Sequence, residues 1–357
     1  MTNLCNSCTR IVSQAISPNA REAVPNRREL SLVAVALIAG CVAFVVSGCA
    51  ATSWRSNFGR DHPLNGHIWY VSAARFIDPQ SLVARLARAD FVLLGERHDN
   101  PDHHLLQAEV LRSLIALGRR PAVGFEMFGL DDDAAIAKHL AVAPKDAAGL
   151  GRAVNWNKRG WPDWGIYQPI AEAAVEAKLP IIATNLPLAT AKKMRSDGLA
   201  VLEPRQRREL DLDRRLSEAM FAHMAADIRS SHCGYGSEES VKAMVGIQRA
   251  RDAQMAQSLI AAGAPDGAVL IAGAGHVRND YGIPVYLTAK APGKPVISIA
   301  FLEVADQKSE PQEYALAYGN GRLPFDYVWF TPRVDNEDPC EKFKAQFENL
   351  KKRRYRP

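Results

Sequence analysis

FVLLGERH, residues 91–98, joins an apolar run to a group of charged side chains. Residues 91–94 are all apolar, the run ends at Gly95, and Glu96, Arg97 and His98 follow directly. A run of this length is typical of a strand whose two faces are both covered. Residues 102–117 then repeat apolar side chains at helical spacing. The sequence therefore predicts strand, loop and helix in succession.

Four more apolar runs of strand length follow, at 122–125, 180–185, 269–273 and 296–302. Helical stretches separate them, which predicts right-handed crossovers between parallel strands. We therefore expect an α/β fold with an open, mainly parallel, doubly wound sheet and helices on both faces. Residues 203–262 are long and helical in pattern, and they predict a helical insertion or cap over the sheet.

Polar side chains stand directly after these predicted strands. In an open α/β sheet, ligands bind outside the carboxyl ends of the strands, so we expect these side chains to converge on one edge. Gly-x-x-His occurs there twice, at 95–98 and 273–276, and glycine lets the backbone approach a ligand or strand closely. The two glutamates could be metal ligands, general bases or partners that fix an imidazole tautomer. The set comprises Glu96, His98, Glu126, Asn185, His276 and Arg278.

Two histidines and two aspartates surround the start of the predicted helix. We expect His104 to face solvent, because one turn of helix carries at least one of His103 and His104 away from the site. Asp99 and Asp102 suit helix N-capping and interaction with the helix dipole. We therefore expect structural roles for the two aspartates.

An aromatic segment lies at the start of the next helical stretch. Trp156, Trp161, Trp164 and Tyr167 occur in a region that contains glycine and proline. Most aromatic clusters belong to a core, but this one precedes a helix on the ligand edge. A flat apolar wall there could stack on a planar cofactor.

The first 48 residues resemble a secretion signal. Arg27 and Arg28 precede the uncharged apolar stretch 30–46, which ends in Val46-Ser47-Gly48-Cys49. This ending resembles a bacterial lipobox, so we expect Cys49 to be acylated and to become the mature N-terminus. The stretch is marginal for a bilayer span, which disfavours an uncleaved anchor. The residue after Cys49 is Ala50 rather than aspartate, as in lipoproteins that are transported to an outer membrane. We therefore expect a lipid-anchored protein on the periplasmic face of the cell envelope, at the outer membrane.

The composition is that of a globular chain, with 357 residues, 47% apolar and 23% charged. Its formal charge of +5 is matched by a basic C-terminal run, so nucleic acid is not an expected partner. After cleavage, Cys233 and Cys340 could pair in an oxidising periplasm. The expected domains are a signal peptide at 1–48, a tether and leading segment at 49–89, the α/β domain at 90–332 and a charged tail at 333–357.

Seven segments together resemble the ChaN-like family of iron-regulated haem-binding lipoproteins. The resemblance covers about residues 90–332, and the lipobox agrees with it independently. It implies an α/β core with a helical part, and haem bound at a homodimer interface with two haems packed against each other. The segments are LLGERHDNPDHH at 93–104, VGFEMF at 123–128, WPDWGIYQPIAEAA at 161–174, ATNLP at 183–187, QRARDAQMA at 248–256, AGAGHVRNDYGIP at 272–284 and FDYVWFTP at 325–332.

The resemblance further implies a b-type, ferric haem whose iron is held by a tyrosine, with histidine nearby. Tyr167 is the first candidate for this ligand, followed by Tyr281 and Tyr235. The other residues expected to contact the cofactor are His98, His276, Arg278 and Trp164.

The same Gly-x-x-His pair also resembles a broader superfamily with erythromycin esterase-like and metalloprotease-like members. In this alternative, Glu96, His98, Glu126 and His276 bind a divalent metal ion or activate water, and the protein is a periplasmic hydrolase. A third alternative is a protein that keeps this fold but has lost the ligand or catalytic site. The sequence leaves open whether the protein is an enzyme, although haem binding is the preferred function.

Overall fold

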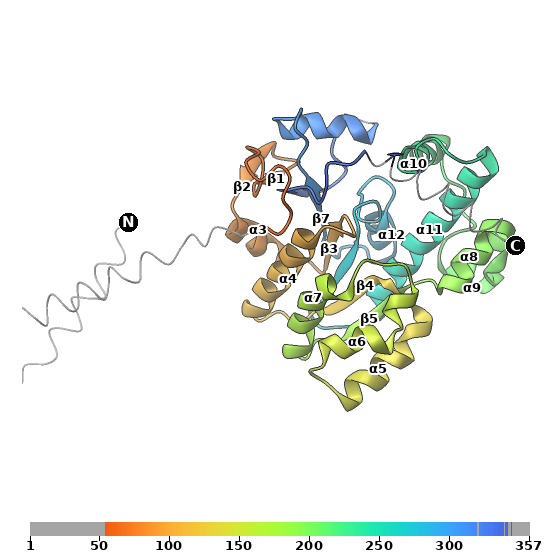
Figure 1. Ribbon diagram of the computed structural model, residues 1–357. Coiled ribbons are helices and arrows are strands. Elements are labelled where there is room, and N and C mark those ends of the chain that lie inside the picture. The colour runs from red at the N-terminus through yellow and green to blue at the C-terminus, as the bar shows by residue number, and fades with distance from the viewer. Residues whose placement is uncertain (1–53, 320, 339, 342–343, 345–357) are drawn as a thin grey trace, which may run out of the picture. The chain divides into compact units, whose positions relative to one another are not determined.

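The computed structural model describes residues 54–319, 321–338, 340, 341 and 344. Their centre is an eight-stranded sheet with the order β2-β1-β8-β7-β3-β6-β4-β5 (Figure 1). The run from β8 to β5 is parallel, and β1 and β2 extend one edge in the antiparallel sense. The strands are β1 Ile68–Tyr70, β2 Arg75–Ile77, β3 Phe91–Glu96, β4 Ala122–Gly129, β5 Ile181–Asn185, β6 Ala268–Gly273, β7 Val296–Glu303 and β8 Tyr327–Thr331.

Helices cover both faces of this sheet. One apolar core joins the sheet to α3 Pro79–Leu86, α4 Pro101–Ala116 and α7 Trp164–Glu176. The other core joins it to α11 Glu238–Ala261 and α12 Ile283–Lys290. Further helices surround these layers (Figure 1). They are α5 Asp133–Val142, α6 Ala147–Ala153, α8 Leu188–Asp197, α9 Pro204–Glu209 and α10 Glu218–Ser231.

Strand β3 shows why continuously apolar runs form the centre of this sheet. Its successive side chains point to opposite faces, so Val92 and Leu94 enter one core while Phe91 and Leu93 enter the other. Both faces are covered by helices, and each position must therefore be apolar. The prediction of an open α/β sheet with helices on both faces is confirmed.

The leading segment is more ordered than its composition predicted. Residues 54–89 were expected to form a tether and a short leading piece, yet they supply β1, β2 and α3. Ile68, Leu82 and Leu86 lie in the core. The sequence did not predict these strands and this helix, because each element is too short to show a clear period. The motif at 325–332 likewise supplies β8, which the strand predictions did not include.

The C-terminal segment is joined covalently to the end of α10. A disulfide links Cys233 and Cys340, whose Cα atoms lie 5.4 Å apart. The sequence had left open whether these two cysteines pair. Arg333, at the start of the expected tail, pairs with Asp306 at 2.8 Å. The apolar stretch 30–46, Cys49 and the basic run 351–356 lie outside the described residues. Among the helices of the described chain, none has the length and apolar character needed to cross a bilayer.

Candidate functional site

The two Gly-x-x-His motifs lie against each other at the carboxyl edge of the sheet. Strands β3 and β6 are parallel neighbours, and Glu96 pairs with Gly273 in the register. A Cβ atom on Gly95 would lie 2.3 Å from Val277 Cγ2, and one on Gly273 would lie 3.0 Å from His98 Nε2. Each glycine therefore makes room for the other motif. This contact explains why both motifs begin with glycine.

Glu96 is the centre of a buried ionic network. Its Oε1 atom lies 2.9 Å from His98 Nδ1, and its Oε2 atom lies 3.0 Å from His104 Nδ1. The other nitrogen of His104 faces the backbone oxygen of His98 at 3.0 Å, and Gln107 Oε1 also faces Nδ1. Because both nitrogens of His104 face acceptors, the geometry fits the protonated imidazolium. Burial opposes ionisation of Glu96, but His104 and His98 outweigh it and hold the carboxyl pKa well below its ordinary value.

The position of His104 corrects one expectation. It was expected to face solvent, but it is fully buried. Burial alone would lower its pKa, yet the charge of Glu96 and its hydrogen bond outweigh this and raise the pKa. The side chain follows His98 by six residues in sequence and packs on Tyr167, with ring centroids 4.0 Å apart. His104 is therefore the internal counter-ion of Glu96.

Tyr167 lies in the core rather than in a ligand cavity. Its side chain is 0% exposed, and its hydroxyl donates to Glu96 at 2.9 Å. Burial and the Glu96 carboxylate raise the pKa of Tyr167 well above its ordinary value, which opposes the phenolate that an iron ligand needs. The expectation that Tyr167 holds iron thus does not fit this arrangement, because its hydroxyl already serves Glu96.

A second ionic network surrounds Glu126 in β4, three residues before the strand ends. Arg251 Nη2 approaches Glu126 Oε1 at 2.6 Å, and His276 Nε2 approaches the same oxygen at 3.2 Å. The backbone nitrogen of Gly273 donates to Oε2 at 2.6 Å. The other nitrogen of His276 lies 2.5 Å from Asp252 Oδ1. His276 is thereby held between two carboxylates.

The charged groups of this network shift one another's pKa values. Burial alone would lower the pKa of His276, but Glu126 and Asp252 outweigh it and raise that pKa to about 9. Burial raises the pKa of Asp252 to about 6, against the effect of His276. Glu126, despite its burial, is kept ionised by His276 and Arg251, which hold its pKa well below the ordinary value. At neutral pH His276 is therefore a cation.

His98 connects the two networks and reaches the surface. Its side chain is 34% exposed, and its ring contacts Trp161 edge-on, with centroids 4.9 Å apart. Burial opposes its charged form, but Glu96 and Glu126 outweigh this and raise its pKa, with His276 acting in the opposite sense. Since these charges act on one ring, the structure brings together the four residues Glu96, His98, Glu126 and His276.

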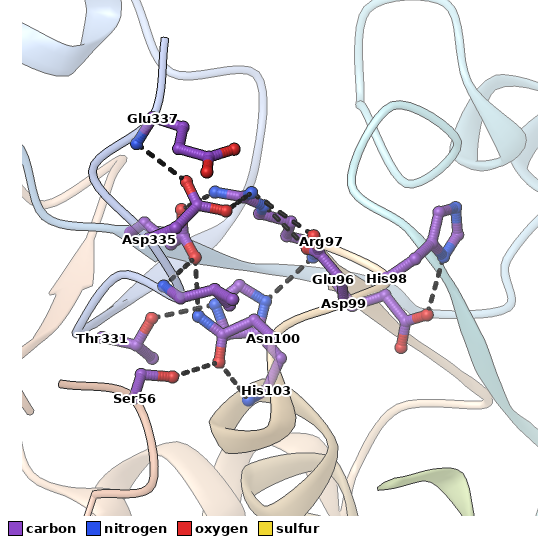
Figure 2. Close-up of polar contacts among 12 residues, drawn as sticks. Ser56, Glu96, Arg97, His98, Asp99, Asn100, His103, Thr331, Asp335 and Glu337 are labelled. Atoms are coloured by element: carbon purple, nitrogen blue, oxygen red, sulfur yellow. Dashed lines mark hydrogen bonds and ion pairs between the residues drawn. The ribbon is translucent and has the colours of Figure 1, made fainter. Parts of the chain in front are cut away.

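The loop after β3 is fastened to both ends of the described chain (Figure 2). His103 Nδ1 accepts from the backbone nitrogen of Arg97, so Nε2 carries the proton and donates to Thr331 at 2.8 Å. Burial lowers the pKa of His103 well below its ordinary value, in keeping with this neutral form. Asn100 Nδ2 donates to Glu303 at 2.8 Å. His103 is thus a structural residue.

The cap of α4 differs from the expectation for the two aspartates. The N-cap is Asn100, whose side chain accepts from the backbone nitrogen of Asp102 at 2.9 Å. Asp102 is buried and accepts from the backbone nitrogens of Arg55 and Ser56, each at 2.8 Å. Asp99 pairs with Arg97 at 2.7 Å. Both aspartates are structural, but neither is the cap. Asn100 takes that position, and Asp102 lies in the first turn of the helix.

A cavity of about 630 Å³ lies beside these networks, beyond the ends of β4 and β5. Glu126 and Asn185 form part of its floor, and Trp161 stands at one side. Helices α8 and α11 supply two of its walls, and the C-terminal end of α10 supplies a third. The remaining lining residues include Met127, Gly129, Asp131, Asn155, Lys158, Arg159, Leu186, Leu188, Ala191, Lys192, Arg195, Ile228, Ser231, His232, Met244, Ile247, Gln248 and Arg251.

The aromatic segment divides between core and cavity. Trp156 and Trp164 are buried, and Trp164 donates to the backbone oxygen of Ala147 at 3.0 Å. Trp161 is half-buried and lines the cavity. Trp164 was expected to contact the cofactor, but it faces inward from the start of α7, and Trp161 lines the cavity instead.

Arg278 and Tyr281 lie away from the cavity and fasten α10 to the loop after β6. Arg278 is buried, pairs with Asp227 and approaches Asp280 at 2.7 Å. The hydroxyl of Tyr281 donates to the same Asp227. Both residues were expected at the cofactor, but their polar atoms are engaged by these carboxylates. Tyr235, the remaining tyrosine candidate, is 41% exposed.

Sequence reasoning missed several functional positions on α11. Gln248 lies 3.0 Å from His276 Nδ1, while Arg251 and Asp252 hold Glu126 and His276. The segment 248–256 was noted only for its resemblance, and its apolar period is weak. In the described ranges, no group of three or more His, Cys, Asp or Glu side chains is arranged to hold a metal ion.

These features define an α/β protein with a cavity at the carboxyl edge of a mainly parallel sheet. A family model described as haem-binding uptake, Tiki superfamily, ChaN matches residues 82–287. The match covers more than half of the chain, and the chain belongs to this family. A search among curated proteins gave no match.

Among solved structures, one with a TM-score above 0.5 shares the fold. The chain is 20% identical to ChaN of Campylobacter jejuni, described as binding haem cofacially, with a TM-score of 0.57 over 73% of this chain and 95% of that one. An erythromycin esterase, EreC, in its open conformation is 14% identical, with a TM-score of 0.41 over 83% of this chain and 87% of that one. The first of these likenesses supports the fold alone.

Proposed function

We propose that this protein binds haem in the cavity beyond β4 and β5. The observation that carries the proposal is a cavity of about 630 Å³ at the ligand-binding edge of the sheet, in a chain of the haem-binding uptake family. In open α/β folds this edge is where ligands bind. Ligand pockets range from about 300 to 1,000 Å³, so the volume suits a tetrapyrrole.

The chemistry of the walls fits a flat, mostly apolar ligand. Trp161 offers an aromatic face at one side, and Met244 and Ile247 present apolar side chains from α11. Leu188 is half exposed at the start of α8, where a bound ligand would cover it. Burial of such side chains against an apolar ring favours binding. The buried networks beneath hold Glu126 and His98 in fixed positions.

For the iron ligand we propose Tyr235. It is the exposed member of the three candidate tyrosines, and it follows cavity-lining His232 by three residues. A phenolate ligand suits ferric haem. Tyr167 and Tyr281 are less suitable, because their side chains are buried, at 0% and 6% exposure.

The proposal also includes attachment and assembly. We expect Cys49 to carry the lipid anchor, on the strength of Val46-Ser47-Gly48-Cys49, and to hold the protein at the periplasmic face of the outer membrane. Cofacial binding is described for the C. jejuni protein, and the same arrangement here would place haem between two copies of this chain. Mass spectrometry of the membrane fraction tests the first point. Sedimentation with and without haem tests the second.

The haem site is tested by filling the cavity. Ala191 on α8 lines it, whereas Ala189 on the same helix is exposed and outside the lining. Titration with ferric haem, followed by absorbance, should show stoichiometric binding for the wild type and for Ala189→Trp. Ala191→Trp should lose binding while its circular dichroism remains native. Equal binding by both tryptophan variants would refute the location, and a flat wild-type titration would refute the function.

A further inference from the structure

The cavity carries more positive charge than its own carboxylates balance. Arg159 is paired with Asp132, and Arg251 is paired with Glu126. Lys158, Lys192 and Arg195 also line the cavity. Within the ranges that the structure describes, none of these three cations forms an ion pair, and each is exposed.

The spacing on α8 directs two of these cations toward the cavity. Its lining residues follow the spacing i, i+3, i+4 and i+7, which is one face of a helix. Lys193, which follows the lining residue Lys192, does not line the cavity and pairs with Asp197 at 4.0 Å. The face begins with apolar side chains and ends with cations. Its members are Leu188, Ala191, Lys192 and Arg195.

Helix α11 repeats the same arrangement. Its lining residues have the same spacing, and they run from apolar side chains at the N-terminal end to polar ones near the floor. They are Met244, Ile247, Gln248 and Arg251. The third cation, Lys158, belongs to the short helical turn Trp156–Lys158 that precedes Trp161. The cavity is therefore amphipathic, with apolar walls and a group of unpaired cations.

Asp131 is the remaining carboxylate in the lining, and it forms no ion pair within the described chain. Three cations thus face one carboxylate. A ligand with two carboxylates and an apolar body would complement this charge, since charged groups at a rim set orientation and specificity. Arginine can hold a carboxylate through two hydrogen bonds, and lysine acts as a point charge.

We propose that Lys158, Lys192 and Arg195 bind the carboxylates of an amphipathic dicarboxylate, so that the cavity selects tetrapyrroles with free propionates. The inference rests on the proposed function, because it names the chemical class that the same cavity accepts. Binding of the carboxylates by these cations does not require iron in the ligand. Metal-free protoporphyrin, which keeps both propionates, should bind in the same orientation, whereas the dimethyl ester of haem should lose this part of its affinity.

The test measures binding of haem, haem dimethyl ester and metal-free protoporphyrin by the full-length protein. The variant Lys192→Ala/Arg195→Ala should bind haem and protoporphyrin about tenfold more weakly, because it loses two exposed ion pairs with the ligand. It should bind the ester as the wild type does. Lys193→Ala is the control for a lost lysine charge on α8, because it removes one cation from another face of the helix, and it should bind all three ligands normally. Lys158→Ala tests the third cation.

The outcomes separate the two proposals. If the wild type binds haem but the double variant binds it equally well, or if the ester binds as tightly as haem, the carboxylate subsite is refuted while haem binding stands. Equal weakening by Lys193→Ala would also refute it, because only general charge would then matter. If the wild type binds none of the three ligands, both proposals fall. Unchanged melting of each variant shows that the fold is intact.

Discussion

The two tyrosines Tyr167 and Tyr235 should separate stability from haem ligation. Tyr167→Phe removes a hydroxyl that donates to ionised Glu96 at 2.9 Å, within the core. Tyr235→Phe removes one from an exposed side chain. The first change should destabilise the fold without altering the haem spectrum. The second should alter the spectrum and leave stability nearly unchanged.

The hydroxyl of Tyr167 faces two acceptors, Glu96 Oε1 at 2.9 Å and the backbone oxygen of His98 at 3.3 Å. The cost of Tyr167→Phe depends on the donors that these two acceptors retain. Glu96 Oε1 still faces His98 Nδ1 at 2.9 Å, and the backbone oxygen of His98 still faces His104 at 3.0 Å. Neither acceptor is left without a donor, so the loss stays near the lower end for a charged hydrogen bond, about 1.5 kcal/mol. For a domain of this size, that lowers Tm by roughly 3–6 °C.

The assay combines thermal unfolding with absorbance of the ferric haem complex. Tyr235→Phe should melt within about 0.5 kcal/mol of the wild type, as surface changes usually do, and should lose the charge-transfer band of phenolate ligation. The reverse result, an altered spectrum for Tyr167→Phe and a normal one for Tyr235→Phe, would refute the reasoning. Unchanged stability of Tyr167→Phe would refute the Glu96 network.

Three further changes test the networks that hold the site. The raised pKa of His276, about 9 against 6.5, stabilises the fold below pH 6.5, and this stabilisation is lost as pH rises through 9. The free energy of unfolding of the wild type, measured in urea, should therefore fall by about 3 kcal/mol between pH 6.5 and 9. A His276→Asn variant whose free energy of unfolding falls equally over this pH range would contradict the prediction. Cys233→Ser should cost about 2–4 kcal/mol by freeing the C-terminal segment from α10, with dithiothreitol-treated wild type as the comparison; equal melting of oxidised and reduced protein would contradict this. Asp102→Ala should cost about 3 kcal/mol and speed amide exchange at Arg55 and Ser56, and unchanged exchange there would remove its anchoring role.

The central sheet could be predicted from the sequence because its strands are apolar at every position. The runs at 91, 122, 181, 269 and 296 all became strands β3 to β7. The convergence of Glu96, His98, Glu126 and His276 followed from the rule that parallel strands end at one edge. The edge strands β1 and β2 could not be predicted, since three residues are too few to show alternation.

The roles of individual side chains were less predictable, because burial depends on how helices pack. His104 and Tyr167 come from α4 and α7, and their contact with Glu96 requires the packing of these two helices on the sheet. The same holds for Trp161 and Trp164, which are close in sequence but lie in the cavity and in the core. The sequence identified this aromatic segment, but the expectation chose Trp164 rather than Trp161 as the side chain that faces the ligand.

The location of bound iron is the most direct test of haem binding at the sheet edge. A crystal of the protein grown with ferric haem, measured at the iron absorption edge, should give an anomalous peak in the cavity bounded by α8, α10, α11 and Trp161. A peak on another surface, or a crystal that excludes haem at saturating concentration, would contradict the account.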